Sequence, residues 1–398
     1  MGVTADGRNA GAVDARRDDP LRQAEARAYQ RAGRRRGRLH RAALAPLALL
    51  AMLGGARISS ALGTPGPELL AAAVYAWAAI AALWLAGLPF ALDGERAARR
   101  AGLSSQRLPG WFADQAKGLA ISMLIAPPAL WGIVVAVRHW PHGWWLPVTI
   151  GSTALELIVT VIAPVVIVPL FLRSHPLPPG PLADDLHALA ARAGVHVRAL
   201  RVLEASAKLT AANAFVAGIG PTRRIVLFDN LLGEDPDTER QIAETRSVLA
   251  HEFGHHASGD LWRLSAASAA ATALALAAVA AALTRLPEAL SHRSAGAFAM
   301  LPALFACAAV TQFVTRIALG AYSRRRERAA DAYGIALIGD GEPFARALES
   351  LCATNLAELR PPRLQQWLGA GHPPPCERIA RARSQGKENP TSGANGAL

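Results

Sequence analysis

The sequence predicts a mostly α-helical, polytopic membrane protein with about six transmembrane helices and a smaller α+β domain on the cytoplasmic side. The first observation is composition: of 398 residues, 52% are hydrophobic and only 18% are charged, which is too apolar for an ordinary soluble protein of this length. The second is a series of apolar runs long enough to cross a bilayer. The third is a polar island, Arg173 to Arg263, between two of those runs.

The amino-terminal region begins with a basic tail over residues 1–41, whose polar and small residues predict disorder, as they do for the tail at 384–398. Ala42–Leu62 follows as a candidate span, in addition to five clearer ones further along the chain. Its apolar core is short and Arg57 interrupts it, and a basic flank before such a segment is also typical of a signal peptide. We favour a span that is retained.

Five clearer runs follow, each near the length of about 20 apolar residues that crosses the hydrocarbon core. With Ala42–Leu62, the first three form a membrane domain over residues 42–172. The last two interrupt a second domain over residues 173–383. The runs are Leu69–Leu92, Leu119–Val137, Trp145–Leu172, Leu264–Leu283 and Ala297–Leu319.

Charged residues set the expected orientation of these spans. Arginines gather before the first span, between the second and the third, and after the last, whereas the alternate loops carry few. Positive charge inside therefore puts both termini and the polar island on the cytoplasmic face. Glu156 lies within an apolar run, so we expect it to face a wet interior or to be paired.

The polar island has its own pattern of short elements. A proline-rich exit from the membrane leads into a helical pattern at Leu182–Ala193. Another helical pattern begins at Thr238, and a third covers Arg324–Ile338 after the last span. Between the first two, β-type runs bounded by turn residues predict strands at Val195–Leu203, Asn213–Val216 and Ile225–Asp229.

The helix that begins at Thr238 carries the sequence His-Glu-Phe-Gly-His. His251 and His255 are four residues apart, so both imidazoles face the same side and can bind one ion. Glu252 is displaced around the helix and reaches a water on the metal instead. This arrangement is that of zinc peptidases, in which zinc lowers the pKa of water to about 7 and the glutamate takes its proton. The simpler alternative is a polar helix whose histidines face solvent.

A third ligand must come from elsewhere in the chain. Ser258 and Leu261 occupy the positions where the long metzincin motif requires glycine and histidine, so that class is excluded. Glu327, with Asp331 one turn later on the same face, offers a ligand and a supporting partner. Asp260 is the rival ligand, and Glu327 could instead pair with a neighbouring arginine. Spacing alone leaves this choice open.

Four ordered motifs resemble those of the integral-membrane zinc endopeptidases of the type I CAAX prenyl protease family, to which the HtpX-type proteases are related. They are NAFVAGIGPTRRIVLFDNLL, LAHEFGHH, then after two spans SRRRERAADAYG, and finally HPPPCERI. The resemblance covers about residues 42–383. The long amino-terminal membrane region favours the CAAX protease branch.

This resemblance implies a zincin-like catalytic domain over residues 173–383 that holds one Zn²⁺ ion per chain. Extended substrates would add to a strand that lines the cleft, and a positive group would hold the substrate carbonyl or its developing oxyanion. The implied roles are zinc ligation by His251, His255 and Glu327, general base and acid catalysis by Glu252, support of the metal site by Asp331, oxyanion or carbonyl binding by His372 and Arg378, and substrate binding by Asn213. In the plainer alternative, Asn213 lies in a turn, and His372 and Arg378 are a helix-entry histidine and a solvated charge.

The predicted function is therefore peptide-bond hydrolysis at the cytoplasmic surface of a cell membrane. The expected partners are a peptide or membrane-protein substrate, carboxy-terminal segments among them, and the lipid bilayer. Nucleic acid is not expected, because no nucleic-acid module accompanies the net charge of +12. The alternatives are an HtpX-like quality-control protease and a scaffold with structural zinc, although the latter would usually need a fourth ligand. The alanine and arginine content indicates a bacterial source.

Overall fold

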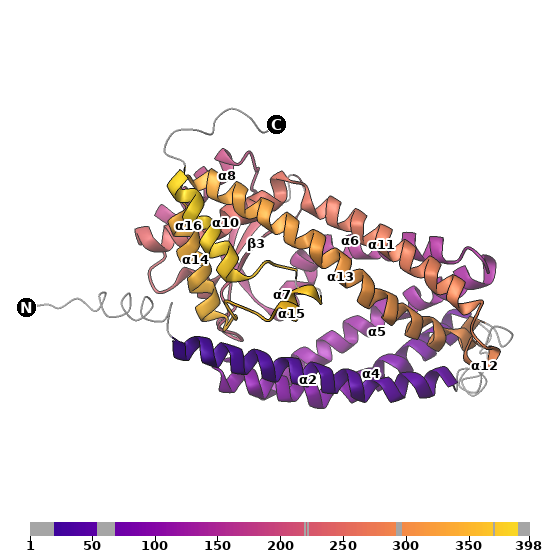
Figure 1. The fold of residues 1–398 in the computed structure, drawn as a ribbon. Coiled ribbons are helices and arrows are strands. Elements are labelled where there is room, and N and C mark those ends of the chain that lie inside the picture. The colour runs from indigo at the N-terminus through magenta and orange to yellow at the C-terminus, as the bar shows by residue number, and fades with distance from the viewer. Residues whose placement is uncertain are drawn as a thin grey trace, which may run out of the picture.

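The computed structural model describes residues 20–53, 68–218, 220, 223–291, 297–368 and 371–388. Long helices extend toward one end of the molecule, and a small sheet with shorter helices occupies the other end (Figure 1). In chain order the helices are α2 (Pro20–Leu53), α4 (Glu68–Arg100), α5 (Leu108–His139), α6 (Trp145–Ile162), the π-helical η1 (Ala163–Ile167), α7 (Val168–Phe171), α8 (Pro181–Arg192), α9 (Asp229–Leu232), α10 (Glu239–Ala257), α11 (Asp260–Leu283), α12 (Glu288–Ser291), α13 (Ala297–Ile338), α14 (Gly341–Thr354), α15 (Arg363–Trp367) and α16 (Pro375–Glu388).

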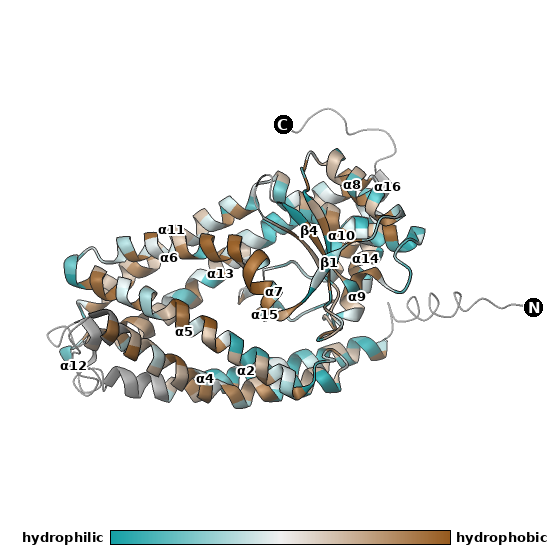
Figure 2. Ribbon diagram, turned by 180° about the vertical axis from the view of Figure 1, so that it is seen from behind, coloured by the Kyte–Doolittle hydropathy of each residue, from teal (hydrophilic) through white to brown (hydrophobic). Residues whose placement is uncertain are grey.

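Five of the described helices are long and apolar enough to cross a membrane. They coincide with the five clearer apolar runs to within a few residues, so the polytopic class predicted from the sequence is confirmed. Many of their large apolar side chains are exposed, as a lipid-facing surface requires. Hydrophobic residues cover much of α5, α6 and α7, and hydrophilic residues gather toward the sheet (Figure 2). The five candidates are Ala73–Arg100, Leu108–His139, Trp145–Phe171, Asp260–Leu283 and Ala299–Ile338. The sixth candidate, Ala42–Leu62, lies partly in α2 and partly outside the described residues.

The expectation of a disordered tail up to residue 41 is wrong from Pro20 onward, because α2 begins there. Its alanines, arginines and leucines are strong helix formers, and its charges find partners far along the chain. Arg34 lies 3.0 Å from the buried carboxylate of Glu358, and Arg36 lies 2.8 Å from Asp93 on α4. The predicted carboxy-terminal tail is likewise helical as far as Glu388, where α16 ends.

The sheet contains four strands in the order β1-β2-β4-β3: β1 (Ser174–Pro176), β2 (Ala199–Leu203), β4 (Arg224–Phe228) and β3 (Ala214–Ala217). β2 and β4 are parallel, and the two outer pairs are antiparallel. The three strands predicted from the sequence are confirmed as β2, β3 and β4. β3 is an edge strand, so one side of its backbone is not hydrogen-bonded within the sheet.

One face of the sheet packs against α8 and α10 to form the main core of this region. Alternate residues of β2 and β4 point into this core, where they meet large apolar side chains of both helices. Phe253 of α10 is fully buried there, between His251 and His255 in sequence. The core thus fixes α10 against the sheet and sets which of its faces remains open. The central members are Leu200, Val202, Ile225, Leu227, Leu186, Leu249 and Phe253.

Candidate metal centre and catalytic cleft

The helix α10 carries His251, Glu252 and His255. The Thr238 side chain caps its first turn by accepting a hydrogen bond from the Gln241 amide. The chain reverses direction after α10 at Gly259, whose φ of 62° is in the left-handed region that glycine adopts without strain. This turn starts α11 at Asp260 and directs the Asp260 side chain back toward α10.

Two glycines bring α10 and α13 into backbone contact. A Cβ atom added at Gly254 would lie 2.8 Å from the backbone of Ala330, and one added at Gly334 would lie 2.9 Å from the His251 amide nitrogen. Only glycine permits an approach this close, because any side chain would collide with the facing backbone. The contact sets the histidines of α10 beside Glu327 of α13.

Three side chains converge on one point at this contact. The Nε2 atoms of His251 and His255 are 3.2 Å apart. Glu327 Oε2 lies 3.5 Å from His251 Nε2, and Glu327 Oε1 lies 3.6 Å from His255 Nε2. One potential ligand atom from each residue lies within 4.8 Å of the other two. Among the described residues, this is the only cluster of histidine, cysteine, aspartate or glutamate with that geometry.

The chemistry of these donors fits a divalent metal ion. Glu327 Oε2 is buried and accepts no well-oriented hydrogen bond from any described residue, although His372 Nδ1 lies 2.8 Å away. A buried carboxylate oxygen without a donor is costly unless a cation approaches it. Two imidazoles and a carboxylate are a ligand set that zinc accepts, with a fourth position left open for water or substrate.

Each histidine is oriented by a carboxylate on the far side of its ring. His251 Nδ1 lies 2.9 Å from Asp331 Oδ1, and His255 Nδ1 lies 2.8 Å from Asp260 Oδ2. An arginine holds each carboxylate in turn: Arg378 donates to Asp331 at 2.6 and 2.8 Å, and Arg326 donates to Asp260 at 2.5 Å. Such partners fix the ring orientation and leave both Nε2 atoms free to bind metal.

This arrangement distinguishes the two candidates for the third ligand. Glu327 is near both Nε2 atoms, whereas Asp260 contacts the opposite ring nitrogen of His255. The geometry therefore favours Glu327 as a ligand and gives Asp260 a supporting role that the sequence did not reveal. Arg326 was also missed, because its pairing with Asp260 depends on how two distant helices meet.

Glu252 lies between two cavities that together form a cleft beside β3. One, of about 160 Å³, is lined by Asn213, His372 and Arg378 and by apolar side chains of α14. The other, of about 270 Å³, is lined by Val216 and His255 and by residues of α6 and η1. Burial raises the pKa of the Glu252 carboxyl, and the positive charge of neighbouring histidines opposes that shift.

The remaining predicted residues line this cleft or a cavity in the membrane region. Asn213 precedes β3 and lines the smaller cleft cavity, as His372 does. Arg378 also lines it but is bound to Asp331, so it positions His251 as well. Glu156 lines a separate cavity of about 450 Å³ and accepts a hydrogen bond of 3.4 Å from Ser268. Its side chain is exposed there, so the expectation that it faces a wet interior or is paired stays a prediction.

The chain matches two family descriptions that together cover most of its length. Residues 176–385 match peptidase family M48, and residues 22–173 match the CAAX prenyl protease amino-terminal region, described as five membrane helices. The M48 match alone covers more than half of the chain.

Individual relatives agree with these matches. The uncharacterized metalloprotease YhfN of Bacillus subtilis is 29% identical over 311 residues, which is 76% of this chain and 70% of that protein. The CAAX prenyl protease 1 homolog of Arabidopsis thaliana is 28% identical over 301 residues, 73% of this chain and 68% of that protein. The crystal structure of S. mikatae Ste24p has the same fold, with a TM-score of 0.77 and 20% identity over 91% of this chain and 88% of that one. The chain therefore belongs to peptidase family M48 and is a membrane metalloprotease.

Proposed function

We propose that this metalloprotease is a CAAX-prenyl-protease-like endopeptidase that uses one zinc ion per chain, held by His251, His255 and Glu327. The observation that supports this most strongly is the convergence of those three side chains beside Glu252, with a hydrogen-bonded carboxylate behind each imidazole. The relatives named CAAX prenyl protease 1 homologs support the substrate class.

The reaction would proceed in the cleft along β3. His251, His255 and Glu327 would hold the zinc ion, which would supply Lewis acidity to polarise the scissile carbonyl and acidify water. Glu252 accepts a proton from the attacking water and returns it to the leaving amine, and its raised pKa suits both roles. His372, at the edge of the cleft, donates to the carbonyl oxygen as negative charge develops there.

Substrate binding would use the open edge of β3. An extended peptide could add to this strand through main-chain hydrogen bonds and so pass Glu252 from one cleft cavity to the other. Asn213 lies at the end of β3 that faces the smaller cavity. The apolar wall of that cavity, formed by Phe344, Leu348 and Leu351 of α14, would accept an apolar side chain next to the scissile bond.

We assign the catalysis to the cytoplasmic side of a bacterial cell membrane, in a catalytic domain over residues 173–383 that follows a membrane domain over residues 42–172. The arginine distribution supports the orientation, and the content of alanine and arginine supports the source. Cysteines introduced at Ser206 and Ser384 test the orientation with an impermeant reagent on intact cells. Labelling of either from outside would overturn the assignment.

The function is tested with the purified full chain in lipid nanodiscs. A farnesylated peptide, the same peptide without the lipid, and an unprenylated membrane protein are offered in parallel, with Glu252→Gln as the control. We expect zinc-dependent cleavage of the farnesylated peptide by the wild type alone. Equal cleavage of all three substrates would favour an HtpX-like role, and no cleavage by the zinc-loaded protein would leave only a structural metal site.

A further inference from the structure

The sheet has a second face, opposite the core that it forms with α8 and α10. Residues of β2, β4 and β3 that are cross-strand partners share a face, so Arg201 and Val226 point the same way, as do Arg224 and Ala217. At the centre of this face, Leu203, Ala217 and Val226 are buried against Val168 and Leu172, at the end of the membrane helix formed by α6, η1 and α7. At one end of the same face, arginine side chains take the place of apolar ones.

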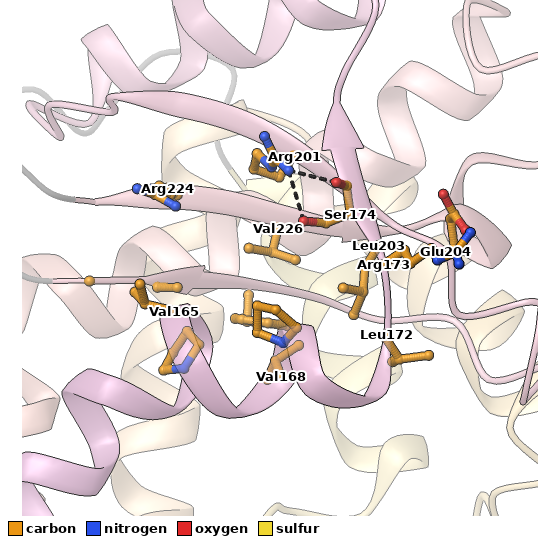
Figure 3. A pocket seen from close by; sticks show the side chains of 15 residues that line it. Val165, Val168, Leu172, Arg173, Ser174, Arg201, Leu203, Glu204, Arg224 and Val226 are labelled. Atoms are coloured by element: carbon orange, nitrogen blue, oxygen red, sulfur yellow. Dashed lines mark hydrogen bonds between the residues drawn. The ribbon is translucent and has the colours of Figure 1, made fainter. Parts of the chain in front are cut away.

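These arginines line a cavity of about 480 Å³ between the sheet and the end of that helix (Figure 3). Arg173, Arg201 and Arg224 contribute three positive charges to the lining, and Glu204 contributes the one negative charge. Arg201 donates to the carbonyl oxygen and hydroxyl of Ser174, at 2.6 and 2.9 Å, and both acceptors are uncharged. Neither Arg173 nor Arg224 forms an ion pair with any residue that the structure describes. The lining therefore carries a net excess of positive charge, because three arginines face one glutamate.

The opposite wall of the cavity is apolar and comes from a candidate membrane helix. It is formed by Pro164, Val165 and Val168, at the carboxy-terminal end of the candidate span Trp145–Phe171, and by Leu172 directly after it. Val165 is also half exposed. Apolar residues give way to Arg173 at this level, which is where phospholipid head groups lie beside a membrane helix.

We infer that this cavity binds the head group of an anionic phospholipid. Arg201 and Arg224 hold the phosphate, since guanidinium groups match its oxygens in pairs. Val165 and Val168 contact the first carbons of the acyl chains. A free phosphate would leave the apolar wall uncovered, and a zwitterionic lipid would leave the excess positive charge uncompensated.

A peptide with an acidic residue is the competing occupant. This cavity shares Pro164, Ala217 and Gly218 with the larger cleft cavity beside Glu252, so a substrate could reach it. The lipid is favoured because the apolar wall comes from the end of a candidate membrane helix, at the level where its apolar residues give way to Arg173. The inference concerns a binding site outside the metal centre, and it does not depend on which peptides the protein cleaves.

Native mass spectrometry of the full chain in detergent, titrated with dioleoyl phosphatidylglycerol or dioleoyl phosphatidylcholine, tests the inference. We expect one molecule of phosphatidylglycerol to be retained in preference to phosphatidylcholine. Glycerol 3-phosphate alone should compete weakly, because it lacks acyl chains. Arg224→Gln should weaken phosphatidylglycerol binding about 5-fold, and Arg201→Gln/Arg224→Gln about 30-fold.

Two controls keep the outcome interpretable. Arg198→Gln/Arg360→Gln removes the same charge from exposed arginines outside the cavity and should leave binding unchanged. Arg201→Lys/Arg224→Lys keeps the charge but loses the paired guanidinium contacts, so it should bind more weakly than the wild type and more tightly than Arg201→Gln/Arg224→Gln. Equal retention of the two lipids, or unchanged binding in Arg224→Gln, would overturn the inference. An increase in KM for acidic peptides with unchanged lipid binding would assign the cavity to the substrate instead.

Discussion

Replacing Gly254 with alanine perturbs the metal centre without touching a proposed ligand. The new Cβ atom would lie 2.8 Å from the Cα and carbonyl oxygen of Ala330, whereas ordinary contacts begin at 3.4 Å. Neither neighbour is a flexible side chain, so α10 and α13 must separate by roughly 0.6 Å. His251 and His255 flank Gly254 on one helix, and Glu327 lies one turn before Ala330 on the other, so the ligands separate with the helices.

The size of the effect follows from the tolerance of metal sites. Ligand distances in such sites stay within about 0.2 Å of their preferred values, so a separation of roughly 0.6 Å exceeds that tolerance about threefold. We expect zinc affinity to fall at least tenfold. Overpacking costs about 1–3 kcal/mol of folding free energy, and the better helix propensity of alanine offsets roughly 1 kcal/mol of that.

Zinc affinity is measured by competition with a chromogenic chelator, and stability by thermal unfolding followed by circular dichroism. Gly132→Ala is the matched control, because this helical glycine of α5 has no neighbour within 4 Å of an added Cβ atom. It should keep full zinc affinity and activity. If Gly254→Ala binds zinc as tightly as the control, the close helix contact does not hold the ligands together.

Four further substitutions test the roles of individual side chains. Glu252→Gln should keep its zinc, measured by elemental analysis. Its peptidase rate should fall by about 1,000-fold or more, because an amide cannot accept the proton. Glu327→Ala should empty the site, whereas Asp260→Ala should still bind zinc with affinity reduced about 10- to 100-fold. If dialysed Asp260→Ala loses its zinc and dialysed Glu327→Ala keeps it, Asp260 is the ligand and Glu327 is not. Arg34→Ala leaves the buried carboxylate of Glu358 without its partner at 3.0 Å and should lower stability by about 1–2 kcal/mol, and an unchanged melting curve would show that α2 is not needed to hold that segment.

The parts of the centre that could be predicted from the sequence are those governed by helix geometry. His251, Glu252 and His255 lie within two turns of one helix, so their relative directions follow from 3.6 residues per turn. Glu327 and Asp331 are related in the same way. The apolar runs were equally predictable, because the thickness of the bilayer sets their length.

What could not be predicted depends on how distant segments meet. Asp260 was considered only as a ligand, because the sequence does not reveal that the turn at Gly259 aims its carboxylate at the outer nitrogen of His255. The polar composition of residues 20–41 suggested disorder, yet Arg34 and Arg36 pair with Glu358 and Asp93, which lie far along the chain. In each case the deciding contact joins elements whose proximity exists only in the folded chain.

The length of α13 links the metal centre to the membrane. This helix is continuous from Ala297 to Ile338, through its apolar half and into the half that carries Glu327 and Asp331. Glu327 lies 30 residues beyond Ala297, or about 45 Å at 1.5 Å per residue. That distance equals the thickness of a bilayer with its head groups, about 40–45 Å. If Ala297 lies near one membrane surface, the metal centre lies at the other, at the depth where a lipid-attached substrate would present its peptide chain to Glu252.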